Sequence, residues 1–257
     1  MMAGGHGLPL QQRMIGFVTK RILQNDRSLR IVDYGCGNGG FVVAMKKAGF
    51  DAVGVDITAE YVQIAKAKCE SMGVAPDRIT LISEDRLPFP PESFDCVYSN
   101  TVLEHVRDVD SYLSECRRVL KRSGILFCTV PVRFSLIEGH IPLPLAHWLP
   151  AGRLRRFYIR ALAQRGMHEL GAADIGQYFD EYICRLNYWT PSVWKEVFRR
   201  YFRTVREVTL EKKQFEAAHM PAHLFYAVSK IPVAANALLW LVRQTTTMNL
   251  IAAEPLP

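Results

Sequence analysis

The chain lacks the cysteine spacing of a zinc site or of a disulfide framework. Its six cysteines are scattered over 257 residues, and no two form a C-x-x-C pair. Zinc sites and small disulfide-rich domains both depend on closely spaced cysteines. We therefore expect no metal site and a reducing compartment, the cytoplasm. The cysteines are Cys36, Cys69, Cys96, Cys116, Cys128 and Cys184.

Long apolar runs are also absent. No uncharged apolar stretch reaches the roughly 20 residues that a membrane-spanning helix needs. Residues 1–7 are small and polar rather than an apolar secretory signal. We expect a cytoplasmic protein, or one bound peripherally at the inner face of the membrane. A chain of 257 residues can build one large domain with a full core.

Acidic residues are scarce in the second half of the chain. Residues 1–130 carry 16 Lys and Arg against 15 Asp and Glu, whereas residues 131–257 carry 16 against 10. Segment 153–165 holds five arginines and no acid. Such a concentration of positive charge favours an anionic partner: a membrane surface, a phosphorylated substrate or a nucleic acid.

The most informative segment is a glycine-rich turn between two apolar runs. Residues 31–34 predict a strand, and a second apolar run, 52–55, ends at Asp56. Glycines let the backbone approach a ligand closely, and an acid after the second strand accepts hydrogen bonds from a ribose diol. The unit therefore predicts a site for a nucleoside-bearing cofactor. Its glycines, Gly35, Gly37, Gly39 and Gly40, satisfy both G-x-G-x-x-G and G-x-G-x-G.

Asp33 favours a cationic cofactor over a dinucleotide. It lies two residues before the first glycine, where its charge would repel a diphosphate. A methionine-type cofactor, which carries an ammonium and a sulfonium, would be attracted instead. Two alternatives are less favoured: a dehydrogenase that uses the same glycine spacing, and a cofactor-binding protein without turnover.

Strand and helix patterns alternate along the chain. This alternation predicts an α/β fold: a Rossmann-like, seven-stranded, mostly parallel sheet with helices on both faces. Ligands of such sheets bind beyond the carboxyl ends of the strands. The expected strands are 30–34, 52–56, 79–83, 94–99, 125–130, 205–210 and 223–229, and the expected helices are 10–23, 39–48, 58–72, 108–120 and one from Pro191, capped by Thr190.

The same pattern divides the chain into five expected segments. The regular alternation stops between 132 and about 187, a stretch rich in proline, aromatic and basic residues. Between Ile231 and Ala253 the only charge is Arg243, so this tail docks on the domain, completes a homodimer or rests on a bilayer. The segments are a helical cover (1–29), a cofactor-binding core (30–131), a substrate lid (132–190), the rest of the core (191–230) and an apolar tail (231–257).

Three further motifs follow the glycine-rich turn in order: LPFPPESFDCV at 87–97, VLEHV at 102–106 and RVLKRSGIL at 118–126. Together with the turn they resemble class I S-adenosylmethionine-dependent methyltransferases, in the branch that acts on small molecules, quinones, lipids and sugars. The resemblance runs from about Ile31 to Pro131. It implies S-adenosyl-L-methionine as the cofactor and a helical substrate lid inserted between strands five and six.

The resemblance also implies individual roles. Asp56 would bind the ribose hydroxyls, and Ile57 would lie against the adenine. The family usually has an acid about four residues before Leu-Pro-Phe, but this chain has Ser83 there, so we favour Asp85 for the adenine amino group. The cofactor-binding candidates are Asp33, Gly35, Gly37, Gly39, Asp56, Ile57, Asp85 and Asn100, the last bordering the methyl-transfer chamber.

Two histidines are candidates for a catalytic base. A hydroxyl acceptor benefits from a base with a pKa near neutrality. His105 follows Glu104 after the fourth strand, close to the expected methyl group, and its alternative role is to fix that loop. His140 lies in the expected lid, where it faces either substrate or solvent. A third histidine, His147, is expected to pack.

A helix over 153–165 would be amphipathic. Its apolar side would lie opposite the arginines, as in helices that rest in an anionic headgroup layer. The alternative is an ordinary solvated arginine face. The apolar side would consist of Leu154, Phe157, Tyr158, Ala161 and Leu162.

We expect O-methylation of a small-molecule, glycan or lipid-linked acceptor. Segment 131–150 is similar to methyltransferases of cell-surface polysaccharide and glycolipid assembly, which favours a lipid or sugar acceptor. The alternative is C-methylation of a quinone or terpenoid. A nucleic-acid acceptor is disfavoured, because residues 99–102 read Ser-Asn-Thr-Val and not Asn-Pro-Pro-Tyr or Asp-Pro-Pro-Tyr.

Overall fold

The computed structural model describes the core of the chain and parts of the expected lid. Its described residues are 10–83, 86–134, 145, 148–149, 152–162, 185–212 and 247–256. The strands are β1 (Arg30–Tyr34), β2 (Asp51–Asp56), β3 (Ile79–Leu81), β4 (Phe94–Asn100), β5 (Leu120–Val130), β6 (Phe202–Glu207) and β7 (Met248–Pro255). The helices are α1 (Leu10–Phe17), η1 (Val18–Ile22), α2 (Gly40–Lys47), α3 (Ala59–Ser71), η2 (Pro76–Arg78), α4 (Val109–Val119), α5 (Arg153–Leu162) and α7 (Pro191–Arg199).

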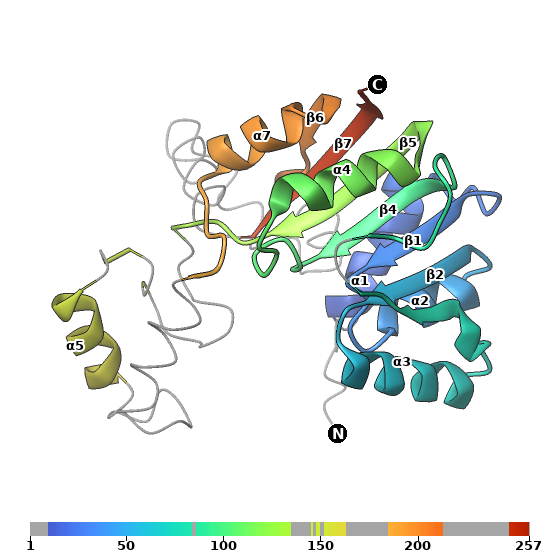
Figure 1. The fold of residues 1–257 in the computed structure, drawn as a ribbon, viewed down its shortest axis with the longest axis horizontal. Helices are drawn as coiled ribbons and strands as arrows, with labels where there is room; N and C mark the ends of the chain where they lie inside the picture. The colour runs from blue at the N-terminus through green and yellow to red at the C-terminus, as the bar shows by residue number, and fades with distance from the viewer. Residues whose placement is uncertain are drawn as a thin grey trace, which may run out of the picture.

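These strands form one seven-stranded sheet in the order β3-β2-β1-β4-β5-β7-β6 (Figure 1). The strands β1 to β5 pair in parallel, and β7 is antiparallel to both of its neighbours. The expected α/β fold with a mostly parallel sheet is therefore confirmed. The order changes direction at β1 and β4, so their carboxyl ends flank the crevice where such sheets bind ligands.

Helices cover both faces of the sheet because the central strands alternate their buried side chains between two cores. Ile31 and Cys96 point to the core formed with α1, α2 and α3. Val32 and Val97 point to the core formed with α4 and α7. This period of two, with both sides apolar, is what a strand buried on both faces requires.

A capping acid marks the start of α4, and a proline marks the start of α7. The Asp108 side chain accepts a hydrogen bond of 2.9 Å from the Ser111 N–H and so caps α4. Thr190 occupies the N-cap of α7, and Pro191 takes the first helical position as expected. A proline fits there because its missing N–H would have no partner within the helix.

The strand between β5 and β6 differs from the expectation. The predicted strand 223–229 lies outside the described residues. Instead, β7 comes from the segment expected as an apolar tail, and it pairs along its length with β5 and β6. Residues 248–255 thus belong to the core sheet. The other proposed segment boundaries stay predictions, as does the covering role of the lid, from which the structure describes α5.

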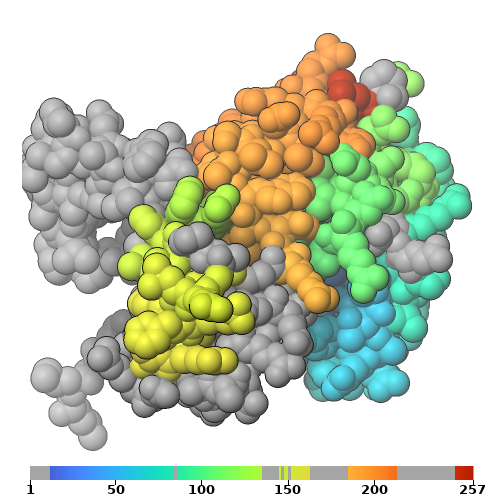
Figure 2. All heavy atoms as spheres, turned by 60° about the vertical axis from the view of Figure 1, so that its left-hand side comes forward, coloured from blue at the N-terminus to red at the C-terminus, as the bar shows by residue number. Residues whose placement is uncertain are grey.

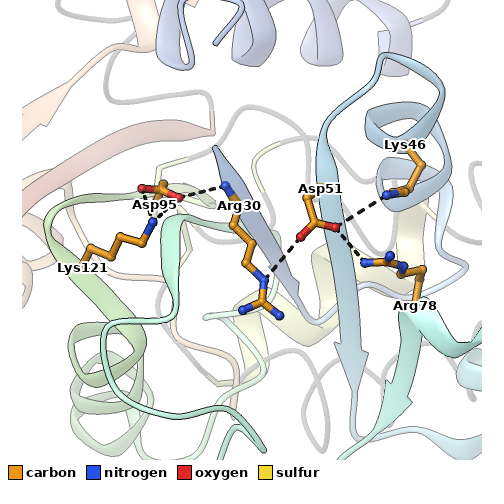
Figure 3. A network of polar contacts seen from close by, with 6 residues as sticks. All are labelled: Arg30, Lys46, Asp51, Arg78, Asp95 and Lys121. Atoms are coloured by element: carbon orange, nitrogen blue, oxygen red, sulfur yellow. Dashed lines mark hydrogen bonds and ion pairs between the residues drawn. The ribbon is translucent and has the colours of Figure 1, made fainter. Parts of the chain in front are cut away.

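Charged residues gather at the amino ends of β1, β2 and β4, at the edge opposite the glycine-rich turn (Figure 3). Asp51 lies 3.5 Å from Arg30 Nε, 3.6 Å from Lys46 Nζ and 2.7 Å from Arg78 Nη1. Asp95 accepts a hydrogen bond from the Arg30 N–H at 2.9 Å and another from Lys121 Nζ at 2.8 Å. The network joins adjacent strand ends, so its role is structural.

Replacing the acid at the centre of this network should weaken the fold without affecting ligands. Asp51→Asn removes one charge that three cations share, and we expect the free energy of unfolding to fall by about 1 kcal/mol. Urea denaturation measures this change. The control is Asp77→Asn, at an exposed acid of η2, which should change it by less than about 0.5 kcal/mol. Equal effects of the two substitutions would contradict a special role for the network.

Candidate functional site

A cavity of about 560 Å³ opens at the carboxyl ends of the central strands. Its volume lies within the range of small-molecule sites. The glycine-rich turn forms one wall, α1 contributes Met14 and Ile15, and β5 contributes Thr129. The rings of Phe41 and Tyr98 stack with their centroids 3.7 Å apart and form a flat apolar part of the lining.

Backbone contacts hold the glycine-rich turn against β2. The N–H groups of Gly35 and Cys36 both donate to the Val55 carbonyl oxygen at 2.9 Å. Gly35 has a φ of +85°, and a Cβ there would lie 2.5 Å from Val102 Cγ2. A larger residue would therefore be strained and would also clash. The motif requires glycine at this position for packing as well as for access to a ligand.

Asp56 ties the turn to the start of α3. Its Oδ2 accepts a hydrogen bond of 2.8 Å from the Gly37 N–H, and its Oδ1 accepts one of 2.9 Å from the Thr58 N–H. Asp56 is 8 % exposed and is not among the described residues that line the cavity. Each oxygen keeps acceptor capacity for a further donor, because a carboxylate has about four lone-pair sites. The role of Asp56 toward a ribose stays a prediction.

Asp33 is the acidic group on the cavity wall, with a relative exposure of 3 %. Burial, and then the negative charge of Asp56, raise the pKa of Asp33 well above its ordinary value. The same two acids and burial raise the pKa of the adjacent Cys36 thiol, which stays neutral. A cation in the cavity would favour the ionised form of Asp33 over the protonated form.

The turn after β4 forms another part of the site. Asn100 is exposed and lines the cavity, as does Thr101, whose N–H donates to the Thr129 carbonyl oxygen at 3.0 Å. Glu104 is buried, and its Oε1 lies 3.9 Å from His105 Nε2. His105 is off the cavity wall. Its pairing with Glu104 fits the loop-fixing alternative, and its role as a base stays a prediction.

Asn187 holds this turn from the far end of the expected lid. Its Nδ2 donates to the carbonyl oxygens of Leu103 at 2.9 Å and Val106 at 2.7 Å. Its backbone N–H donates to the Glu104 carbonyl oxygen at 2.9 Å. The sequence gives no local signal for this contact, because its partners lie more than 80 residues apart in the chain.

Of the other predicted positions, the structure describes Ile57, which is not among the residues that line the cavity. Ile57 is 65 % exposed at the start of α3, and its contact with adenine stays a prediction. Asp85, His140 and His147 lie outside the described residues. Two lining residues that the sequence patterns do not indicate, Lys212 and Thr247, come from late in the chain.

Comparison with known proteins finds a family model that matches the expected cofactor-binding core. Residues 32–128 match the family model described as "Methyltransferase domain". Over these residues the chain is similar to class I S-adenosylmethionine-dependent methyltransferases. The match covers the glycine-rich turn, the acid at the end of β2, the Leu-Pro-Phe motif and most of β5.

Curated relatives of this methyltransferase domain resemble it over the same part. The "Ubiquinone biosynthesis O-methyltransferase" of Cereibacter sphaeroides is 33 % identical over 130 residues, which cover 49 % of this chain and 52 % of that protein. The protein of the same name from Sinorhizobium fredii is 29 % identical over 129 residues, with the same coverage. The chain thus spans about half the length of the curated relatives it matches.

Solved structures share the fold over nearly the whole chain. The "[4+2]-Cyclase SpnF" has a TM-score of 0.55 at 19 % identity and covers 95 % of this chain and 81 % of that one. The geranyl diphosphate C-methyltransferase from Streptomyces coelicolor has a TM-score of 0.54 at 15 % identity and covers 95 % and 79 %. At these identities the likeness shows the Rossmann-like fold alone.

Asp33 should lower the stability of the empty folded protein and should increase its affinity for a cationic ligand. Because its folded pKa is raised, the native state keeps a proton that the unfolded state loses, and this acid's contribution to stability falls as pH rises above its ordinary pKa. Asp33→Asn should therefore raise the melting temperature of the empty protein, by more at pH 7 than at pH 5. The same change should weaken binding of S-adenosylmethionine at least about tenfold.

Calorimetry and thermal melts at both pH values measure the two effects of Asp33→Asn. Asp77→Asn provides a control with the same change of charge at an exposed site. A stability gain that stays constant with pH, or an unchanged affinity, would contradict the role assigned to Asp33.

Asn187→Ala should loosen the turn after β4 while leaving the glycine-rich wall intact. Loss of two hydrogen bonds in a partly buried site should lower the free energy of unfolding by about 1–2 kcal/mol. The affinity for S-adenosylhomocysteine should change little. Chemical denaturation and calorimetry test the pair of outcomes, with the exposed Gln63→Ala as the control. A large loss of affinity would show that the turn and the cavity wall are not separate.

Proposed function

We propose that the protein binds S-adenosyl-L-methionine in the 560 Å³ cavity and transfers its methyl group to an oxygen of an acceptor. The observation that carries the proposal is the buried acid Asp33 on the wall of a cavity that the glycine-rich turn forms. A dinucleotide would bring a diphosphate to this acid, whereas an ammonium and a sulfonium complement it. The methyltransferase domain match supports the same choice.

The cofactor-binding residues have complementary proposed roles. Asp33 interacts with the cationic methionine end of the cofactor. The turn of Gly35, Gly37 and Gly39 lets this end of the cofactor approach the protein backbone. Asp56 accepts hydrogen bonds from the ribose hydroxyls through the acceptor sites that Gly37 and Thr58 leave open. At the adenine end, the roles of Ile57 and Asp85 are carried over from the family resemblance.

The chemistry requires positioning more than covalent participation. The bound cofactor supplies a methyl group and its own leaving group. Residues at the end of β4, Asn100 and Thr101, lie on the cavity wall and so border the space open to an acceptor. Correct placement of two reactants is worth up to about 7–11 kcal/mol of the barrier. His105 and His140 remain the proposed candidates for removing a proton from a hydroxyl acceptor.

The proposed acceptor is a small molecule with a quinone-type ring, methylated on a hydroxyl oxygen. Support comes from the names of the curated relatives, which are O-methyltransferases of ubiquinone biosynthesis. Glycan and lipid-linked acceptors remain part of the proposal because segment 131–150 resembles methyltransferases of polysaccharide and glycolipid assembly. This segment lies largely outside the described residues. C-methylation of a quinone or terpenoid is the alternative, and a nucleic-acid acceptor is disfavoured. A homodimer and a cytoplasmic location are carried as predictions.

Titration calorimetry with S-adenosylhomocysteine tests the cofactor proposal. The parent protein should bind, and Asp56→Ala should weaken binding at least about tenfold, because it removes the ribose acceptor and releases the Gly37 N–H. Asp51→Ala is the matched control. Asp51 lies at the amino end of β2, the end opposite Asp56, and its replacement should leave the affinity unchanged. Binding of NAD in place of S-adenosylhomocysteine would overturn the proposal.

Transfer of a labelled methyl group tests the acceptor. Hydroxylated quinone precursors, phenols and lipid-linked sugars are offered separately, and mass spectrometry locates the added methyl. Methylation on carbon would select the alternative reaction.

A further inference from the structure

Helix α5 exposes large apolar side chains. Leu154 is 62 % exposed and Phe157 is 72 % exposed. Residues three apart lie on the same side of a helix, so these two form one patch. Figure 1 shows α5 set apart from the sheet, and Figure 2 shows it at the surface in yellow. Exposed side chains of this size, gathered on one helix, indicate a contact with a partner.

The exposed side of α5 differs from the expected one. Ile159 and Leu162, of which Leu162 was expected on one apolar face with Leu154 and Phe157, are buried instead. Arg155, expected among the solvated arginines, is also buried, at 7 % exposure, and its Nη1 lies 3.5 Å from the Leu149 carbonyl oxygen. Arg155 thus fastens α5 to the preceding segment, and Leu154 and Phe157 are left facing outward.

Positive charge lies beside the apolar patch. Arg153, Arg156 and Arg160 are exposed, and α5 contains no acidic residue. Helical spacing places these three arginines together, next to Leu154 and Phe157, on the half of the helix that faces away from Ile159 and Leu162. The exposed half of α5 is therefore basic along one side and apolar along the other.

The segment before α5 also exposes apolar side chains. Leu145 is 40 % exposed and Trp148 is 42 % exposed. The Trp148 indole donates from Nε1 to the Phe134 carbonyl oxygen at 3.0 Å, and its ring meets the Phe134 ring at a centroid distance of 5.6 Å. Trp148 is thus held by the chain that leaves β5 while part of its ring stays exposed. Tryptophan and arginine both favour the interface between water and lipid headgroups.

We propose that this surface docks on an anionic lipid bilayer. The docking surface is the exposed half of α5, where Leu154 and Phe157 lie beside the arginines Arg153, Arg156 and Arg160. The arginines pair with lipid phosphates, and the apolar tips enter the boundary between headgroups and acyl chains. Among the described residues no helix is long and apolar enough to cross a membrane.

The charge pattern selects the bilayer over a second copy of the chain. Two such surfaces facing each other would bring six arginines together without an acid from α5 to pair with them. An anionic bilayer supplies the opposite charge and an apolar layer at the same time. Docking does not depend on methyl transfer, and it can be tested without the cofactor.

Vesicle flotation with the full chain tests the docking surface. Vesicles of phosphatidylcholine alone are compared with vesicles that also contain phosphatidylglycerol. The parent should bind the anionic vesicles and not the neutral ones. Two double variants, Arg156→Glu with Arg160→Glu and Leu154→Ser with Phe157→Ser, should each reduce the bound fraction at least about fivefold.

Matched controls make the same types of substitution at other exposed positions. Arg199→Glu with Arg203→Glu repeats the charge change on and after α7, and Met72→Ser with Val193→Ser repeats the apolar loss. Both controls should float with the vesicles as the parent does. Circular dichroism confirms that each variant is folded.

Several outcomes would overturn the proposal. One is a parent that fails to bind anionic vesicles, and another is a pair of controls that lose binding as much as the α5 variants do. Unchanged binding of the Leu154 and Phe157 variant would exclude insertion of apolar side chains. Concentration-dependent dimerisation that this variant abolishes, without vesicle binding by the parent, would assign the surface to a second copy.

Discussion

The two hydrogen bonds that the Asp56 carboxylate accepts are the constraint on which the candidate site depends. They fix the Gly37 N–H on one side and the Thr58 N–H on the other, so one side chain joins the glycine-rich turn to the first turn of α3. The Val55 carbonyl oxygen holds the same turn by accepting hydrogen bonds from the Gly35 and Cys36 N–H groups. These contacts hold the turn at two points, and Asp33 in β1 lines the cavity beside it.

The buried strands and the helix starts could be predicted from the sequence because their signals are local. The expected strand 30–34 and the expected start of α7 agree with the structure. The pairing of β7 could not be predicted, because its partners β5 and β6 are distant in the chain and strand pairing depends on the whole sheet. A run of apolar residues late in the sequence indicates burial, but it does not say against which strand.

In the candidate site, too, residues in local motifs could be predicted and contacts between distant segments could not. Asp33, Gly35, Gly37 and Asn100 could be placed at the cavity, because they belong to motifs at the carboxyl ends of β1 and β4. Asn187 could not, since its contact with the turn after β4 forms only when the chain returns from the expected lid. The orientation of α5 was also unpredictable in detail. Arg155 is long enough to be buried along its stem, and charge alone does not reveal this.

The position of β7 determines when the sheet can be completed during synthesis. Residues 248–255 lie between β5 and β6, so β6 has no described strand partner until these residues have left the ribosome. Until then β5 lacks its described partner on that side, and an open strand edge is prone to pair with other chains. A nascent chain that pauses after β6 is therefore exposed to aggregation, and chaperones have most to protect in that interval.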